Sequence, residues 1–359
     1  MTAIGDLAAR RVVGLPTYRP GKPSTGSAAG KLSSNESPLG AGPSVSDALR
    51  AAAGHPHRYP DDSATRHRLA AELGVTQSQL LLTNGSDELC YLIAQMFLAP
   101  GKRAVLGDPC YAIDNTVSLL SGADVVRVPL VRGAHDLRAM AAAAIDASAL
   151  WLPSPHNPTG VAVSHGELVL FLREVPADCL VVLDQAYHAF SSPGTSPDVA
   201  ALLAQFPNLL VQRTMSKDWA LAGLRVGYAI AAPEIIGPLS AIRPPFSVNS
   251  FALAGLSAAV GQPAWQAMSV ARVREGRALL QAELDSLGVE YYPSEANFVL
   301  VHIDHSELAP YLLEAGLSVR SGADLGMPGW IRITIGWAPT MATLIDALRK
   351  FSSAVPNNG

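Results

Sequence analysis

Charged side chains are scarce in this chain. Asp, Glu, Lys and Arg make up 16% of its 359 residues, whereas hydrophobic residues make up 49%. This balance argues against an intrinsically disordered protein and favours a compact fold, long enough for two domains. The formal net charge is −4 and no Lys/Arg cluster is present. Nucleic acid is therefore not expected as the main partner.

Cysteine and long apolar runs are also lacking. Cys90, Cys110 and Cys179 are odd in number and show no paired metal-site spacing. We therefore expect no metal site, no disulfide framework, and a reducing, cytoplasmic location. No stretch approaches the roughly 20 apolar residues of a membrane span. Arg10 and Arg11 interrupt the first residues, so no signal peptide and no membrane association are expected.

Short apolar runs alternate with stretches of helical spacing over the first two-thirds of the chain. The runs occupy 80–82, 104–106, 149–152 and 180–183, and polar residues follow each of them. This pattern predicts an α/β fold with a mainly parallel sheet covered by helices on both faces. Ligands of such sheets bind beyond the carboxyl ends of the strands, which is where the polar clusters fall.

The two ends of the chain have a different character. Residues 1–45 are rich in Gly, Pro and Ser and predict an irregular arm, followed by a short helix with Ser44 or Ser46 as its N-cap. The proline-containing segment 242–250 predicts a hinge. Beyond it we expect helices at 251–260, 263–287, 306–315 and 340–351, and strands at 297–303 and 330–335. The predicted divisions are an arm (1–45) that joins a small domain, a large cofactor-binding domain (46–245) and the small C-terminal domain (246–359).

Lys217 is poorly placed to be a surface charge. It follows the apolar run 209–211 and lies among small and apolar residues, eight positions before Arg225. Such surroundings disfavour the ammonium form, lower the pKa and favour the free amine that forms a Schiff base. Taken alone, this lysine is more simply one that reaches solvent from a loop, so its interpretation depends on the rest of the chain.

The polar clusters contain what a pyridoxal phosphate site requires. Asp184 follows four apolar residues, and a carboxylate at that strand end suits a protonated pyridine nitrogen. Tyr187 and Asn157 are suited to donate hydrogen bonds to the cofactor's phenolic oxygen. The ring of Tyr111 is suited to stack on the cofactor.

A phosphate site is also indicated. Ser86 and Asp87 begin a predicted helix, whose first N–H groups bind anions, and Ser216 and Arg225 would complete that site. Each of these residues alone has a simpler explanation as a helix cap, a turn or a packed aromatic. Their joint occurrence at strand ends, upstream of Lys217, favours the cofactor site.

On these residues the chain resembles the fold-type I pyridoxal phosphate enzymes of the class I/II aminotransferase family, and within it the histidinol-phosphate aminotransferase branch. The matching motifs run nearly end to end. They are Tyr-Arg-Pro-Gly-Lys-Pro at 18–23, Leu-Ser-Ser-Asn-Glu-Ser-Pro-Leu-Gly at 32–40, Arg-Tyr-Pro-Asp at 58–61, Asn-Gly-Ser-Asp-Glu-Leu at 84–89, Ser-Pro-His-Asn-Pro-Thr-Gly at 154–160, Asp-Gln-Ala-Tyr at 184–187, the segment 216–228, Arg-Pro-Pro-Phe-Ser-Val-Asn-Ser at 243–250, Ala-Asn-Phe-Val at 296–299 and Arg-Ile-Thr-Ile-Gly at 332–336.

The resemblance implies a role for each matching residue. Lys217 would form the Schiff base and act as general base, Asp184 would pair with the pyridine nitrogen, and Tyr187 and Asn157 would bind the phenolic oxygen. Tyr111 would stack on the ring, while the phosphate would be bound by Ser86, Asp87, Ser216, Arg225 and, from a neighbouring subunit, Tyr59. That last role implies a homodimer with shared active sites. Arg332 would bind a substrate carboxylate or phosphate, and Arg320, Tyr18 and Asn157 would line the substrate pocket.

The implied reaction moves an amino group between histidinol phosphate, or an aromatic-type L-amino acid, and a 2-oxo acid such as 2-oxoglutarate. The same residues also suit other α-carbon reactions, such as decarboxylation of a phosphorylated amino acid, elimination or cyclisation. A catalytically inactive binding protein and a nicotinamide dehydrogenase are disfavoured. The chain departs from the family pattern at His156, Gln185, Asp218, Trp219 and at Trp337-Ala338-Pro339. His156 and Trp219 either alter the pocket or only fill space.

Overall fold

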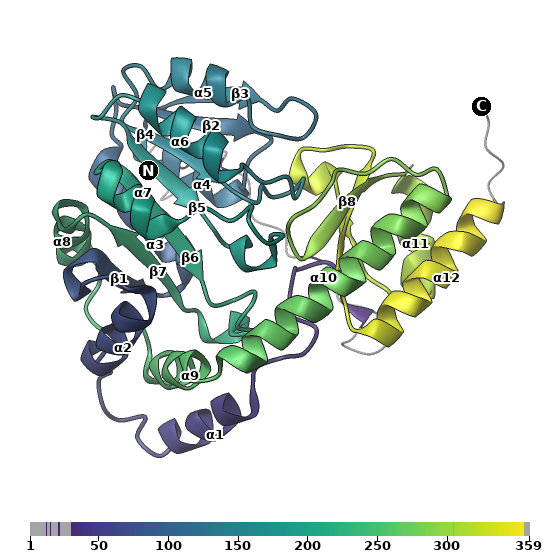
Figure 1. The fold of residues 1–359 in the computed structure, drawn as a ribbon, viewed down its shortest axis with the longest axis horizontal. Helices are drawn as coiled ribbons and strands as arrows, with labels where there is room; N and C mark the ends of the chain where they lie inside the picture. The colour runs from purple at the N-terminus through teal and green to yellow at the C-terminus, as the bar shows by residue number, and fades with distance from the viewer. Residues whose placement is uncertain (1–11, 13–14, 16–20, 22–29, 304, 355–359) are drawn as a thin grey trace, which may run out of the picture.

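The structure, a computed structural model, describes residues 12, 15, 21, 30–303 and 305–354. A seven-stranded sheet in the order β1-β7-β6-β5-β4-β2-β3 forms the larger part (Figure 1). Its strands are β1 (Leu80–Thr83), β2 (Arg103–Asp108), β3 (Asp124–Pro129), β4 (Ala149–Pro153), β5 (Leu180–Asp184), β6 (Leu209–Thr214) and β7 (Gly227–Ala231). Strand β7 runs antiparallel to β1 and β6, and the other pairings are parallel. The prediction of a mainly parallel sheet is confirmed.

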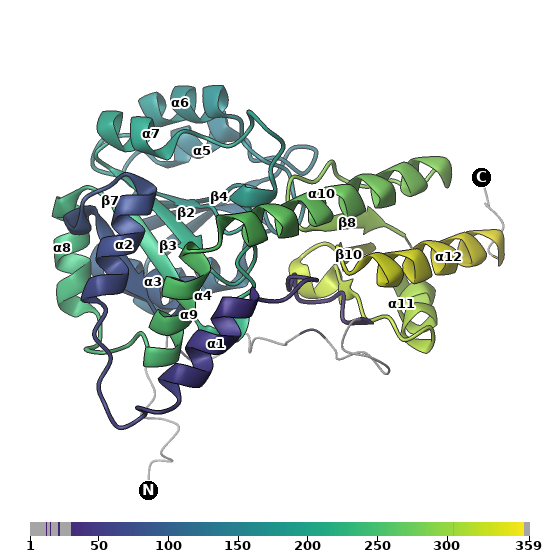
Figure 2. The same cartoon turned by 60° about the horizontal axis from the view of Figure 1, so that its bottom comes forward.

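Helices cover both faces of this sheet, as Figure 2 shows. On one face lie α5 (Leu137–Ala143), α6 (His165–Glu174) and α7 (Val199–Gln205), and on the other α3 (Gly85–Phe97), α4 (Ala112–Ser121) and α8 (Pro233–Ile242). Side chains of a strand alternate between the faces: Val181 and Leu183 of β5 pack in the core under α5 to α7, whereas Leu180 and Val182 pack against α3 and α8. The interior positions of the strands are therefore mostly apolar, with polar exceptions such as Arg127 of β3 and Gln212 of β6.

Three helices close one end of the larger part. They are α1 (Pro43–Ala52), α2 (Ser63–Leu73) and α9 (Ser250–Val260), and α9 contacts both of the others. Asn249 caps α9 by accepting a hydrogen bond from the N–H of Ala252. The N-cap prediction for α1 was wrong. Its N-cap is Gly42, because Pro43 at the first helical position starts the helix earlier, and the hydroxyl of Ser44 instead accepts from Gln262.

A three-stranded antiparallel sheet in the order β8-β10-β9 forms the smaller part. Its elements are α10 (Pro263–Ser286), β8 (Phe298–His302), α11 (His305–Glu314), β9 (Arg320–Ser321), β10 (Trp330–Thr334) and α12 (Ala338–Ala354). The helices and strands predicted beyond residue 250 are present with small shifts at their ends. Leu32 also pairs with this sheet, because its N–H donates to the carbonyl oxygen of Ser318 and its carbonyl accepts from Thr334.

Helix α10 connects the two parts (Figure 1). Helix α9 packs its buried residues in the core of the larger sheet, whereas α10 packs Val270, Val273 and Leu280 in the core of the smaller one. This packing favours a boundary near Gln262 over one at residue 245, and the division into domains stays a prediction. Short 3-10 helices lie at Gln77–Gln79, His188–Phe190, Ala222–Leu224 and Ala323–Leu325. Among the described residues, no helix has both the length and the apolarity needed to cross a membrane.

Candidate active site

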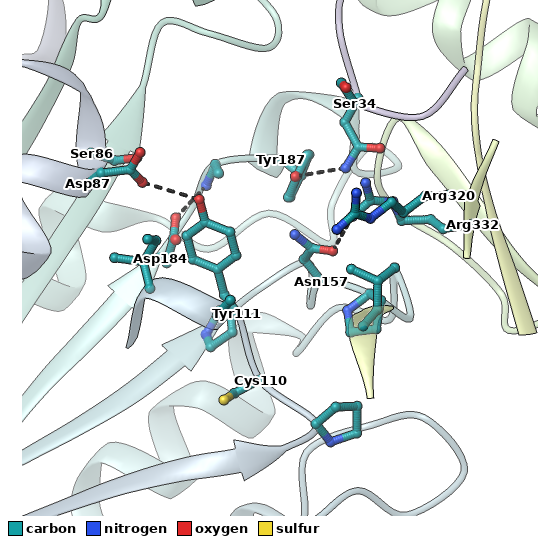
Figure 3. A pocket seen from close by; sticks show the side chains of 18 of the residues that line it. Ser34, Ser86, Asp87, Cys110, Tyr111, Asn157, Asp184, Tyr187, Arg320 and Arg332 are labelled. Atoms are coloured by element: carbon teal, nitrogen blue, oxygen red, sulfur yellow. Dashed lines mark hydrogen bonds between the residues drawn. The ribbon is translucent and has the colours of Figure 1, made fainter. Parts of the chain in front are cut away.

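A cavity of about 520 Å³ opens at the carboxyl ends of β2, β4, β5 and β6, where the three-stranded sheet meets the larger one. Parallel strands bring their carboxyl ends to one edge of a sheet, so residues distant in sequence meet there. Figure 3 shows this cavity with some of the side chains that line it. The predicted residues that line it are Ser86, Asp87, Tyr111, Asn157, Asp184, Tyr187, Ser216, Lys217, Arg225, Arg320 and Arg332.

Lys217 lies in the loop after β6, with its amine turned into the cavity. Its Nζ donates to the carbonyl oxygen of Ser34 at 3.3 Å and lies 5.7 Å from the centre of the Tyr187 ring. Burial first, and then the charge of Arg332, lower the pKa of Lys217 to about 8. About a tenth of this amine is therefore uncharged at pH 7, far more than for an ordinary lysine, and nucleophilic and general base chemistry require this uncharged form.

Asp184 is the last residue of β5 and is buried at the floor of the cavity. Its Oδ1 accepts from the N–H of Ala186 at 2.9 Å, and its Oδ2 accepts from Nε2 of Gln212 at 3.2 Å. Burial raises the pKa of Asp184 to about 6, against the opposing effect of these hydrogen bonds. The carboxyl group is thus mainly ionised at pH 7, in a place where a cationic ring nitrogen would be a favourable partner.

A cradle for an anion lies at the start of α3. Gly85 begins this helix at φ 76°, where a Cβ would meet Nη2 of Arg225 at 2.6 Å. Across from it, a Cβ on Gly227 would lie 2.4 Å from the backbone nitrogen of Ser86. Both glycines therefore allow the backbone and Arg225 to come close to the helix start, whose N–H groups attract anions.

Asp87 ties this cradle to the aromatic ring of Tyr111. The Tyr111 hydroxyl donates to Oδ1 of Asp87 at 3.2 Å, and Nη2 of Arg225 lies 3.1 Å from Oδ2. Figure 3 shows the Tyr111 ring standing in the cavity with its hydroxyl turned towards Asp87. Both carboxylate oxygens of Asp87 are occupied, so its side chain fixes the positions of Tyr111 and Arg225. A bound anion would instead be contacted by backbone N–H groups and basic side chains.

Tyr187 is held by a residue that the sequence interpretation did not assign to the site. Nδ2 of Asn35 donates to the Tyr187 hydroxyl at 2.9 Å. Asn35 is itself fixed by Thr334 and Asn297 through hydrogen bonds of 3.0 to 3.1 Å, and its φ of 55° is in the left-handed region that asparagine tolerates. Its place in the motif at 32–40 was the available signal, but no rule of spacing predicts that contact.

Two arginines from the smaller sheet face one another at the other end of the cavity. Arg320 of β9 and Arg332 of β10 are directly paired in register and are both buried. Nη1 of Arg332 donates to Oδ1 of Asn157 at 2.7 Å, and Nη2 donates to the carbonyl of Ser33 at 3.1 Å. Nε of Arg320 lies 3.8 Å from Asp324. Like charges opposed in a sheet are destabilising, so an anionic ligand would relieve this pair.

Among the described residues, one predicted site residue, Tyr59, does not line this cavity. Tyr18 lies outside the described residues. Tyr59 is 81% exposed, and its ring stacks on that of Phe246 with 4.5 Å between ring centres. The interpretation of Tyr59 required it to reach the site of a neighbouring subunit, so its role and the homodimer stay predictions.

The family departures lie outside the cavity lining. His156 is fully buried, with Nδ1 3.0 Å from the Thr159 hydroxyl and Nε2 3.1 Å from the carbonyl of Pro109. Burial lowers its pKa well below the usual value, so it is a neutral packing residue.

Gln185 accepts two hydrogen bonds from Arg213, and Asp218 accepts one from Gln266. Trp219 packs partly buried against the core of the larger sheet, and Trp337 is 47% exposed. The contacts of His156 and Trp219 therefore fit side chains that only fill space, and not side chains that alter the pocket.

Comparisons with known proteins agree with this architecture. The model of the family described as aminotransferase class I and II matches residues 30–350. The chain is 39% identical to histidinol-phosphate aminotransferase 1 of Dechloromonas aromatica (strain RCB), covering 97% of this chain and 99% of that protein. It is 40% identical to the histidinol-phosphate aminotransferase of Symbiobacterium thermophilum, with 89% of each chain covered.

Among solved structures, the histidinol-phosphate aminotransferase of Sinorhizobium meliloti in complex with pyridoxal-5'-phosphate superimposes with a TM-score of 0.87. It is 26% identical and the match covers 97% of this chain and 98% of that one. The predictions of the fold, the family and the enzyme class are thereby confirmed. The chain belongs to the aminotransferase class I and II family.

Proposed function

We propose that this protein is a pyridoxal phosphate-dependent aminotransferase that exchanges an amino group between histidinol phosphate and a 2-oxo acid such as 2-oxoglutarate. One observation carries the proposal: the cavity joins a buried lysine and carboxylate, Lys217 and Asp184, to a facing pair of buried arginines, Arg320 and Arg332. The first pair suits the cofactor and the second suits an anionic substrate. The curated relatives support the choice of histidinol phosphate.

The lining residues fit pyridoxal phosphate at each of its polar groups. The start of α3, with Ser86, Ser216 and Arg225, would hold the phosphate. Asp184 would hold the ring nitrogen, Tyr187 and Asn157 the phenolic oxygen, and Tyr111 would pack on the ring. The cofactor, when bound, supplies an electron sink for the substrate α-carbon. The cofactor prediction is supported by the solved relative that contains pyridoxal-5'-phosphate.

Lys217 would act in two ways. Its uncharged amine would attach the cofactor covalently, and once released it would accept the proton from the substrate α-carbon and later return a proton. Tyr187 lies close enough to orient this amine, since the distance from Nζ to the ring centre is 5.7 Å. Asp184, negatively charged at pH 7, would keep the ring nitrogen protonated throughout.

Arg332 and Arg320 would bind the substrate's phosphate. The planar guanidinium group of Arg332 is already oriented by Asn157 and Ser33, so little side-chain entropy is lost when an anion binds. A dianionic phosphate suits two opposed arginines better than a single carboxylate does. This electrostatic argument favours a phosphorylated amino donor.

We further propose a homodimer in which Tyr59 of one subunit reaches the cofactor phosphate of the other. Support comes from the exposure of the stacked pair Tyr59 and Phe246, which are 81% and 54% accessible. Exposed aromatic pairs of this kind mark interaction surfaces. A cytoplasmic location is supported by the three free thiols, Cys90, Cys110 and Cys179.

The proposal is tested by mixing the cofactor-loaded protein with one equivalent of histidinol phosphate or with members of an L-amino acid panel. Mass spectrometry then identifies the form of the cofactor and the organic product. We expect histidinol phosphate to convert the cofactor to pyridoxamine phosphate with a matching keto product. Release of carbon dioxide or ammonia from a panel member, without amino-group transfer, would instead support the other α-carbon chemistry on this site.

A further inference from the structure

A row of buried polar side chains runs behind the cavity, away from solvent and from any proposed substrate contact. It starts at Asp184 of β5, passes Gln212 of β6 and Cys90 of α3, and ends at Asp114 of α4. All four residues are at least 92% buried, and Gln212 and Cys90 are completely so. Buried polar groups cost free energy unless they are paired, so this row in an otherwise apolar core calls for an explanation.

The contacts in the row are continuous. Gln212 is the register partner of Asp184 in the neighbouring strand, and its Nε2 donates to Oδ2 of Asp184 at 3.2 Å. The Cys90 thiol lies 3.5 Å from Oε1 of Gln212 and 3.7 Å from Oδ1 of Asp114. Burial raises the pKa of Cys90 well above its usual value, so the sulfur keeps its single proton.

The amide of Gln212 sets the direction of the row. An amide that donates from Nε2 to Asp184 presents Oε1 on its other side, where it needs a donor. The thiol proton of Cys90 meets that need. Since a thiol has one proton, the contact between Cys90 and Asp114 is then made by a proton on Asp114, with the sulfur accepting.

The two carboxyl groups differ in their donors. Asp184 accepts hydrogen bonds from two N–H groups, Ala186 and Gln212, which favour its ionised form. Oδ2 of Asp114 is buried without a partner among the described residues, and no N–H donor meets Oδ1. Burial and the charge of Asp184 raise the pKa of Asp114 well above its usual value. Asp114 is therefore the neutral member of the pair and Asp184 the charged one.

We infer that Gln212 is a positioning residue that fixes the orientation and the negative charge of Asp184, and that Cys90 and a protonated Asp114 hold Gln212 in the donating orientation. The inference rests on the proposed function, in which Asp184 pairs with the cofactor's ring nitrogen. Every donor in the row points towards Asp184. The row thus keeps the carboxylate ready for a cationic partner in a site where burial opposes the charge.

The inference predicts a change in how cofactor affinity depends on pH. The other charged groups that act on Asp184 are Asp87, which raises its pKa, and Lys217, which lowers it. The carboxylate is present above the pKa of Asp184 and is lost as the pH falls through it. Removal of the Gln212 donor raises that pKa further, so the pH at which cofactor affinity is half lost moves upward.

The experiment compares Gln212→Leu with Gln205→Leu, an exposed glutamine of α7 that does not line the cavity. The dissociation constant of pyridoxal phosphate is measured by equilibrium dialysis between pH 5 and 8, with circular dichroism to confirm folding. At pH 7 we expect Gln212→Leu to weaken binding roughly tenfold, as for a lost hydrogen bond to a charged group, and to move the midpoint upward. Gln205→Leu should match the wild type.

Three further variants keep the inference testable if Gln212→Leu does not fold. Cys90→Ala removes the thiol donor and should move the midpoint in the same direction, whereas Cys90→Ser, which keeps a donor, should restore it. Asp114→Asn should leave the midpoint unchanged, because a neutral acid is replaced by a neutral amide. A midpoint that falls in Asp114→Asn would show that Asp114 is charged and would overturn the inference.

Asp184→Ala separates this inference from the proposed function. If Asp184→Ala weakens cofactor binding and Gln212→Leu has the cofactor affinity and midpoint of the wild type, the positioning role of Gln212 is wrong. The proposed cofactor site then still holds. If Asp184→Ala leaves the cofactor affinity unchanged at every pH, the proposed cofactor site itself fails.

Discussion

Nη1 of Arg332 donates a hydrogen bond to Oδ1 of Asn157 at 2.7 Å, and so links the three-stranded sheet to the loop after β4. Asn157 was predicted to bind the cofactor's phenolic oxygen, and this contact leaves its Nδ2 group to do so. One amide therefore serves both ends of the cavity. The arginine that would receive the substrate anion is oriented by the residue that would receive the cofactor.

Arg332→Ala should strongly weaken the binding of a phosphorylated substrate. A lost hydrogen bond to a charged group costs roughly 1.5 to 3 kcal/mol, or roughly a 10- to 100-fold fall in kcat/KM. Arg332→Lys should recover only part of this loss, because lysine lacks the planar two-donor geometry. Arg272→Ala, at an exposed position on α10, provides the control. Steady-state kinetics with histidinol phosphate measure the effect, and equal kcat/KM values for all the variants would remove Arg332 from the substrate site.

Lys217→Ala should abolish covalent attachment of the cofactor. Borohydride reduction of the cofactor-loaded protein followed by intact mass spectrometry should give a mass increase in the wild type and in the control Lys102→Ala. Lys102 is exposed and lies outside the cavity lining. A reduced adduct that persists in Lys217→Ala would contradict the assignment.

Cofactor attachment to the apoprotein should depend on pH through the amine of Lys217. Its pKa of about 8 lies below the usual lysine value of 10.5, chiefly because of burial. The free amine fraction, and hence the attachment rate, should rise about tenfold per pH unit below pH 8 and level off above it. The change in cofactor absorbance measures this rate. Arg332→Met should move the plateau to higher pH, because a neighbouring positive charge is removed; a wild-type rate that levels off only above pH 10 would contradict the lowered pKa.

Gly227→Ala should damage both stability and cofactor binding. The new Cβ would lie 2.4 Å from the backbone nitrogen of Ser86, at the start of α3. Overpacking of this kind costs roughly 1 to 3 kcal/mol of unfolding free energy, and displacement of the helix start should weaken the phosphate site. Gly237→Ala is the matched control, because Gly237 lies in α8 with open space around it and alanine favours a helix. Denaturant unfolding should show a lower free energy of unfolding for Gly227→Ala and a slightly higher one for Gly237→Ala.

Mixing two defective proteins tests the shared active site. We expect Tyr59→Ala and Lys217→Ala each to lower activity when alone. In a mixed dimer, one site would combine the intact Lys217 of one subunit with the intact Tyr59 of the other, and activity should recover. Sedimentation analysis verifies the dimer. An equal mixture that stays as inactive as its components after subunit exchange would contradict the role of Tyr59 across the interface.

Much of this arrangement was predictable because the signals are local. Apolar runs that end in a polar residue placed Asp184 at a strand end, and the spacing after Leu82 placed Ser86 at a helix start. The resemblance then indicated which of these polar residues belong to one cavity. The fold, the family and the enzyme class are confirmed, and the catalytic and binding roles stay predictions.

Other features depend on tertiary contacts that no local pattern contains. Asn35 reaches Tyr187 across 152 positions of sequence, and Gln212 meets Asp184 only because β5 and β6 are neighbours in the sheet. Gln212 did leave a signal, since a glutamine that directly follows the apolar run 209–211 is unusual in a strand buried on both faces. The N-cap of α1 was missed because Pro43 starts that helix one position before Ser44.

The central claim is tested most directly by following the nitrogen atom itself. Cofactor-loaded protein would be given histidinol phosphate labelled with ¹⁵N at its amino group, together with unlabelled 2-oxoglutarate, and glutamate would be analysed by mass spectrometry. The proposed function predicts ¹⁵N-glutamate in the wild type and none in Lys217→Ala. Glutamate that lacks ¹⁵N, or no glutamate at all from the wild-type protein, would contradict it.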